Sequence, residues 1–173
     1  MPVEPGTILS HRIFVLDGPI PLLDESHSQE LTIAYTDDLL RGLKMERLGP
    51  LEFYPAIDLR APGWSWIQPI STSHTSGHYW SAPGHPNIHI DVYSCMPFSW
   101  EEVVRVVHEH FRLLDWTGTL VMREQDLRER AAMHIIGKGK DILRRVELNE
   151  ASFSLPRPPH RVARPCTLVS TAA

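Results

Sequence analysis

The chain has 173 residues, enough for one domain with a hydrophobic core and too few for two full domains. Its formal charge of −4 is spread along the sequence without a basic stripe, so we expect no nucleic-acid partner. No apolar run approaches the ~20 residues of a membrane span, and the first residues do not resemble a secretory signal. Two cysteines do not form a disulfide framework, so a cytoplasmic protein with reduced thiols is predicted.

The first predicted elements are a strand and a helix. Residues 11–17 are apolar and β-branched and are followed by Gly18-Pro19, a pattern typical of a strand and its end. A helix capped by Asp24 or Ser26 is predicted to run to about Met45. Its buried stripe recurs every four residues, at Leu31, Tyr35, Leu39 and Leu43.

Three further strands and a loop are predicted next. The segment 51–59 reads as a strand in which Pro55 favours a sheet edge, and 64–70 as another strand. Residues 81–87 contain two prolines and a glycine and are predicted to form a loop. The segment 88–93 alternates apolar and polar residues, which is typical of a strand with one buried face.

A second helix and a last strand complete the predicted domain. Ser99 and Glu102 have the spacing of a capping box, and Gly118 is predicted to end the helix before a strand at 119–122. The order β-α-β-β-β-α-β predicts an α+β fold, a two-layer antiparallel sheet with helices on one face. The buried stripe of the second helix is predicted at Val103, Val107, Phe111 and Leu114.

The predicted domain is flanked by two less regular segments. Residues 1–9 are predicted to be a flexible N-terminus and residues 10–130 the domain itself. Residues 131–173 are predicted to be a C-terminal extension, helical or irregular up to about Leu148. After that point, prolines at 156, 158 and 159 favour an extended or disordered segment.

The segment from Ser73 to Cys95 carries residues suited to backbone chemistry and proton transfer. A serine hydroxyl is a poor nucleophile unless a base or strain activates it. Gly77 would let the chain bend, so that His78 turns back toward Ser73. Cys95 ends the next strand and is a candidate proton donor or nucleophile at the same rim. The alternative is that this Ser/Thr-rich segment is a turn without a catalytic role.

A zinc site is a second interpretation of the same region, because imidazole nitrogens and a thiolate suit that metal. The spacing does not match a standard zinc finger, so we predict that the site contains no metal. The residues concerned are His74, His78, His85, His89 and Cys95.

The pattern Ser-x-Ser-His-x-Ser-x-His, followed by an Asp-Val-Tyr-Ser-Cys strand, resembles the prokaryotic S-adenosylmethionine decarboxylases. The resemblance covers about residues 10–125. It implies a small proenzyme that cleaves itself, carries a self-generated pyruvoyl group, and pairs into a homodimer of processed units. It also implies a carboxy-lyase that acts on a small molecule, S-adenosylmethionine, in spermidine biosynthesis.

The resemblance assigns roles to four residues and places the cleaved bond between Thr72 and Ser73. Ser73 would become the pyruvoyl group, and His78 would remove its Cα proton during processing. Cys95 would return a proton to the substrate, and Ser65 would stabilise the oxyanion of the first step.

Thr72 departs from the family pattern, which has glutamate before the cleaved serine. The resemblance implies that this residue would become the new carboxyl terminus near the substrate, so its change bears on substrate identity and processing rate. Two alternatives therefore stay open. One is a decarboxylase of arginine or ornithine on the same fold, and the other is an unprocessed, non-catalytic relative that acts as a binding partner.

Overall fold

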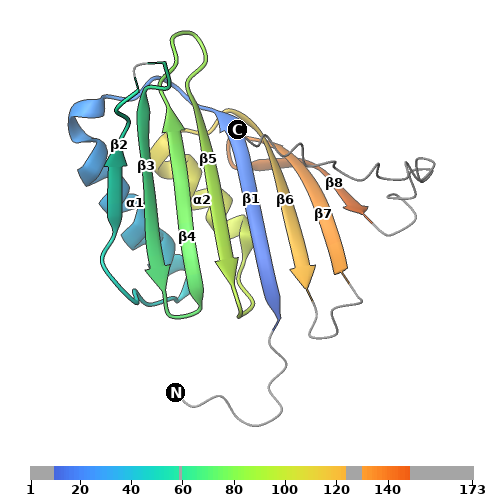
Figure 1. Ribbon diagram of the computed structural model, residues 1–173. Helices are drawn as coiled ribbons and strands as arrows, with labels where there is room; N and C mark the ends of the chain where they lie inside the picture. The colour runs from blue at the N-terminus through green and yellow to red at the C-terminus, as the bar shows by residue number, and fades with distance from the viewer. Residues whose placement is uncertain (1–9, 59, 124–129, 149–173) are drawn as a thin grey trace, which may run out of the picture.

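Two helices lie against one face of an open antiparallel sheet in the computed structural model, which describes residues 10–58, 60–123 and 130–148 (Figure 1). Within these residues the sheet has eight strands in the order β2-β3-β4-β5-β1-β6-β7-β8. The predicted α+β class, with the helices on one face, is confirmed. The predictions of a flexible N-terminus at 1–9 and a disordered Pro-rich segment lie outside the described residues.

The helices are α1 (Ser28–Leu43), preceded by a single 3-10 turn at Glu25–His27, and α2 (Trp100–Phe111). The strands are β1 (His11–Pro19), β2 (Glu52–Pro55), β3 (Gly63–Ile70), β4 (Ser73–Trp80), β5 (Asn87–Ser94), β6 (Asp115–Arg123), β7 (Arg130–Lys138) and β8 (Asp141–Leu148).

The strands alternate between a face buried under the helices and a face left open. In β5, Ile88, Ile90 and Val92 are fully buried, whereas the residues between them are partly exposed. β2, which contains Pro55, forms one edge of the sheet, as the proline predicted. The open face of the sheet is therefore available to carry polar chemistry.

The β4 strand departs from the predicted order, which contains no strand between residues 70 and 88. It pairs with both β3 and β5 along its whole length. Its inward positions are filled by Thr75, Gly77 and Tyr79. A Cβ on Gly77 would lie 2.2 Å from the Trp66 ring, so this glycine makes room for a buried indole and does not bend the chain.

The α2 helix begins as predicted but ends earlier. The Ser99 side chain accepts a hydrogen bond from the Glu102 backbone N–H at 3.2 Å. The Glu102 carboxylate accepts hydrogen bonds from Arg105 and does not bond back to Ser99, so only half of the predicted capping box forms. The helix ends at Phe111, and the C-cap residue Arg112 has a left-handed backbone conformation. Leu114 lies beyond the helix and is 46% exposed, so it is not part of the buried stripe. Gly118 lies within β6 and does not end the helix.

The core lies between the helices and the sheet and is rich in aromatic side chains. Tyr35 of α1 and Phe111 of α2 are fully buried with ring centroids 5.0 Å apart, and Trp66 of β3 stacks on Phe111. Between the helices, His110 binds Asp38 at 2.9 Å, and this hydrogen bond holds the pKa of Asp38 below its usual value. Neither described helix is long and apolar enough for a membrane crossing.

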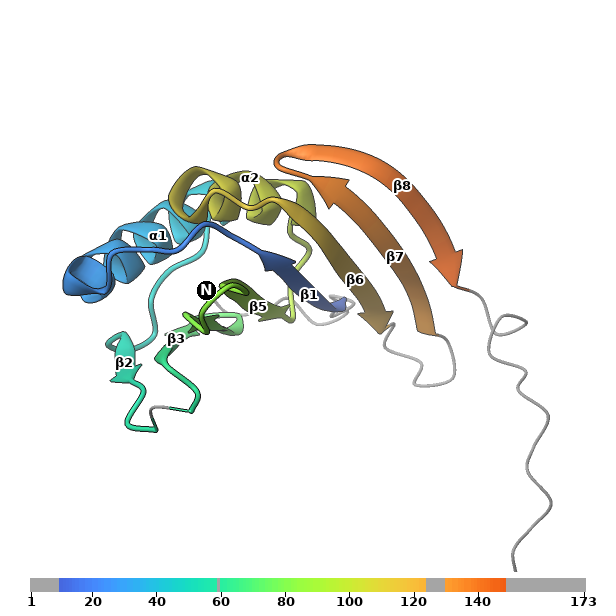
Figure 2. The ribbon, with the colours of Figure 1, turned by 90° about the horizontal axis from the view of Figure 1, so that it is seen from above.

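Residues 130–148 form a hairpin of β7 and β8. The prediction of a helical or irregular segment there was therefore wrong. Gly139 has a φ of +56° in the two-residue turn with Lys140, a conformation that favours glycine and closes hairpins. β6, β7 and β8 bend around the side of α2 (Figure 2). Arg145 of β8 lies over the Trp100 ring at 4.9 Å, so the hairpin is part of the packed fold.

Replacing Gly137 with alanine is expected to lower the free energy of unfolding by about 1–3 kcal/mol, because overpacking a filled core is destabilising. A Cβ at this position would lie 2.2 Å from the Trp116 ring, which is 2% exposed. Thermal unfolding measures the effect. Gly49→Ala is the matched control, since its Cβ would meet its nearest neighbour, Pro69, at 3.8 Å. Equal midpoints for the two variants would contradict the packing of the hairpin.

Candidate active site

Ser73 is the first residue of β4 and has an unusual backbone conformation. Its φ is +151°, a region that residues with a side chain rarely adopt. It directly follows the turn that joins β3 to β4, and it pairs with Ile70 on one side and Ser94 on the other. Such conformations cost about 1–3 kcal/mol and persist only where the surrounding structure holds them in place. The bond before Ser73 is thus held in a strained setting.

The carbonyl oxygen of Thr72 accepts a hydrogen bond from the backbone N–H of Cys95 at 2.9 Å. Cys95 follows the last residue of β5, which is the strand beside β4. A fixed N–H donor at this oxygen polarises the carbonyl and stabilises negative charge that develops on it. This donor was missed in the sequence, since a backbone N–H has no signature there.

Ser65 and His78 form a second group on the open face of the sheet. They are opposite each other in the β3–β4 pairing, and Ser65 Oγ lies 2.7 Å from His78 Nδ1. The two side chains that the sequence singled out are therefore in direct contact. In this pair a serine hydroxyl fixes the orientation of an imidazole that is exposed to solvent.

His78 does not turn back toward Ser73, contrary to the expectation from Gly77. β4 is continuous from residue 73 to 80, and an extended strand advances about 3.3 Å per residue. Five residues therefore separate Ser73 from His78 by roughly 16 Å along the strand. Ser65, paired with His78, is equally distant from the Thr72 carbonyl. Within one chain the site is divided into a Ser73 part and a His78 part.

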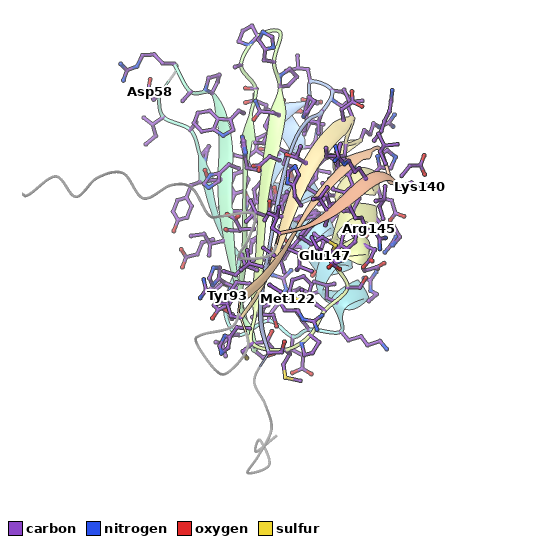
Figure 3. The ribbon with its side chains drawn as sticks, turned by 90° about the vertical axis from the view of Figure 1, so that its right-hand side faces the viewer. Asp58, Tyr93, Met122, Lys140, Arg145 and Glu147 are labelled. Atoms are coloured by element: carbon purple, nitrogen blue, oxygen red, sulfur yellow. The ribbon has the colours of Figure 1, made fainter. Side chains whose placement is uncertain are left out.

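A corner of aromatic and basic side chains surrounds the Ser73 part of the site. His74 Nδ1 lies 3.2 Å from Ser73 Oγ, and its ring meets the Tyr93 ring edge-on with centroids 5.6 Å apart. His11 Nδ1 lies 2.7 Å from the Tyr93 hydroxyl, and Arg123 lies over the Tyr93 ring at 5.8 Å. Figure 3 shows Tyr93 toward the end of the sheet where β6 also ends, close to Met122. The corner thus joins four neighbouring strands beside the strained serine.

The histidines of this region do not form the zinc site that their residue types suggested. His78 and His89 are opposite each other in the β4–β5 pairing, but His89 binds Asp17 at 2.5 Å while His78 binds Ser65. His85 lies in the loop before β5. Among residues 10–58, 60–123 and 130–148, no three His, Cys, Asp or Glu side chains converge as a metal site requires.

Thr72, which stands where the resemblance leads one to expect glutamate, has a buried hydroxyl. This oxygen finds no hydrogen-bond partner in the described part of the chain. The side chain therefore brings no negative charge to the rim beside Cys95.

The fold and the site together define an α+β protein with a strained serine beside a polarised carbonyl and a Ser–His pair on the same open sheet. A family model described as S-adenosylmethionine decarboxylase matches residues 24–124, more than half of the chain. The chain therefore belongs to the S-adenosylmethionine decarboxylase family, a family of carboxy-lyases of polyamine biosynthesis. A search of curated proteins found none that matches.

Proposed function

We propose that this chain is a proenzyme that cleaves itself between Thr72 and Ser73 and then decarboxylates S-adenosylmethionine through a pyruvoyl group made from Ser73. The observation that carries the proposal is the setting of this one peptide bond. Ser73 has a φ of +151°, and the Thr72 carbonyl accepts the Cys95 N–H at 2.9 Å. Strain in the bond and a donor on its oxygen are the two features that a backbone acyl shift requires.

In the first step Ser73 Oγ attacks the carbonyl carbon of Thr72, and the peptide bond is exchanged for an ester. Negative charge develops on the Thr72 oxygen, where the Cys95 N–H already donates. Breaking the bond releases the strain at Ser73, which favours the ester over the starting amide. Both effects come from residues of one chain, so this step does not depend on a partner.

In the second step His78 removes the Cα proton of Ser73, and β-elimination breaks the ester. The elimination frees the Thr72 carboxylate and leaves a dehydroalanine at residue 73. Water then hydrolyses its imine form, which releases ammonia and leaves the pyruvoyl group at the start of residues 73–173. Because His78 is roughly 16 Å along β4 from Ser73 in its own chain, a second copy must supply this imidazole. His78 of the partner subunit, held by Ser65 of the partner subunit, would serve as the base.

A homodimer formed through the open sheet face meets this requirement. The helices cover only one face of the sheet (Figure 1). The other face carries Ile67 and Trp80, which are 43% and 39% exposed, on the same strands as the Ser65–His78 pair. A two-fold axis through this face gives each chain the pair from the other, so that two identical sites form.

Turnover needs an electron sink, which no natural side chain provides. A pyruvoyl carbonyl supplies this chemistry by condensing with a substrate amine. Cys95 follows β5, whose last residue pairs with Ser73, and would return a proton to the substrate carbon after carbon dioxide leaves. Arginine or ornithine is the second candidate substrate, and the neutral Thr72 favours it because no carboxylate side chain is present there to bind a ribose.

Intact mass under denaturing conditions tests the proposal. We expect two species, residues 1–72 and residues 73–173, the second with a pyruvoyl group at its start. A single chain of 19.7 kDa would favour the unprocessed, non-catalytic relative. Release of labelled carbon dioxide from S-adenosylmethionine, arginine and ornithine, measured side by side, then identifies the substrate.

A further inference from the structure

Ser73 needs a base for its attack on Thr72. The histidine in contact with its hydroxyl is His74 and not His78, which the sequence analysis had placed near Ser73. His74 Nδ1 lies 3.2 Å from Ser73 Oγ. His78 binds Ser65 further along the strand. Since a hydroxyl becomes a useful nucleophile only when its proton is removed, the contact with His74 gives the first step its missing component.

The His74 ring is held by its surroundings. Tyr93 of β5, opposite His74 in the strand pairing, meets the His74 ring edge-on at 5.6 Å. The Tyr93 ring is fixed in turn by His11 of β1, which stacks on it at 5.8 Å and bonds its hydroxyl at 2.7 Å. Among the described residues, the titratable and charged groups in contact around this corner include His11 from β1, Tyr93 from β5 and Arg123 from β6. Cys95 follows β5 at the same rim, and the β3 position opposite His74 is Pro69.

We propose that His74 is a catalytic residue of self-processing, the general base for the attack of Ser73 on Thr72. The neutral imidazole, with its proton on Nε2, accepts the Ser73 hydroxyl proton at Nδ1. The C–O bond to Thr72 forms, the C–N bond breaks, and the imidazolium returns the proton to the released Ser73 amine. Protons balance within the chain, and no other reactant is consumed.

The inference rests on the proposed function and divides its two proton transfers between two histidines. His74 acts on the serine of its own chain, because the two residues are adjacent. His78 acts on the serine of the partner subunit, because of its distance along β4. Variants of the two histidines should therefore be blocked at different steps. Only the loss of His78 should be repaired by a second chain that carries this histidine.

Ester formation measured in a His78→Gln background separates the steps. Without the elimination base, the ester should accumulate, and neutral hydroxylamine should split the denatured chain into residues 1–72 and 73–173. Adding His74→Gln should slow ester formation by at least ~100-fold, the usual contribution of a general base. The matched control is His85→Gln in the same background, an exposed loop histidine outside the site, which should leave the ester level unchanged.

Each outcome decides one claim. Equal ester in His78→Gln and in His74→Gln/His78→Gln would overturn the role of His74 and leave the proposed function standing. Absence of both cleavage and ester in the wild-type chain would overturn the proposed function itself. Circular dichroism checks folding, and His74→Asn/His78→Gln provides a second replacement at this exposed position. Co-expression with a Ser73→Ala chain should not rescue His74→Gln, and rescue would contradict action within one chain.

Discussion

Replacing Ser73 with alanine is expected to leave an intact chain of 19.7 kDa and to reduce decarboxylation to background. The hydroxyl that attacks Thr72 is gone, so neither the ester nor the pyruvoyl electron sink can form. Intact mass and carbon dioxide release measure the two losses in the same sample. Since Ser73 lies at a strand end and is only partly buried, folding should be retained.

Ser76→Ala is the matched control for this prediction, because it removes a hydroxyl from the same strand. Ser76 is partly exposed on β4, and its partners in the strand pairing are Ile67 and Asp91. Normal cleavage is expected in this control. Cleavage at residue 72 in the Ser73→Ala chain would show that another nucleophile processes the protein, and would remove the basis for a pyruvoyl enzyme.

Replacing His78 with alanine is expected to stop processing at the ester and to abolish decarboxylation, because the Cα proton of Ser73 stays in place. The defect should be repaired by co-expression with Ser73→Ala, a chain that cannot cleave but still carries His78. With equal amounts and random pairing, roughly half of the His78→Ala chains lie in mixed dimers and become cleaved. Mass spectrometry distinguishes the two chains by their substitutions.

The outcome of this mixture tests the shared site directly. If mixed dimers form and no His78→Ala chain is cleaved, His78 does not act across the interface. Cleavage that continues in His78→Ala alone would assign the Cα proton to a different base. Complementation in the mixture, together with none in either chain alone, is the result that the extended β4 strand requires.

Local patterns of apolar residues were sufficient to predict most of the fold. β5 alternates apolar and polar residues, β1 is an apolar run that Gly18-Pro19 ends, and both helices have buried stripes at helical spacing. β4 was missed because its inward positions include Thr75 and Gly77, which carry little apolar signal. The glycine is required there by the buried Trp66 ring, a packing contact between strands that no local pattern reveals.

The candidate site was predictable in its residue types and not in its arrangement. The family resemblance singled out Ser65 and His78, and these two side chains are in contact at 2.7 Å. Their distance from Ser73 depends on whether Gly77 bends the chain or packs in a strand, and the sequence is compatible with both. The Cys95 N–H on Thr72 follows from the strand pairing, so it was accessible only from the fold.

The position of β1 in the sheet has a consequence for the processed protein. Residues 1–72 carry β1, β2 and β3, and residues 73–173 carry the other described strands. β1 is inserted between β5 and β6, while β3 remains paired with β4. The two fragments are therefore interleaved at three strand boundaries, and each lacks neighbours that its own strands need. Neither fragment would form this sheet alone, so folding must precede cleavage. After cleavage the two fragments should stay associated through their paired strands.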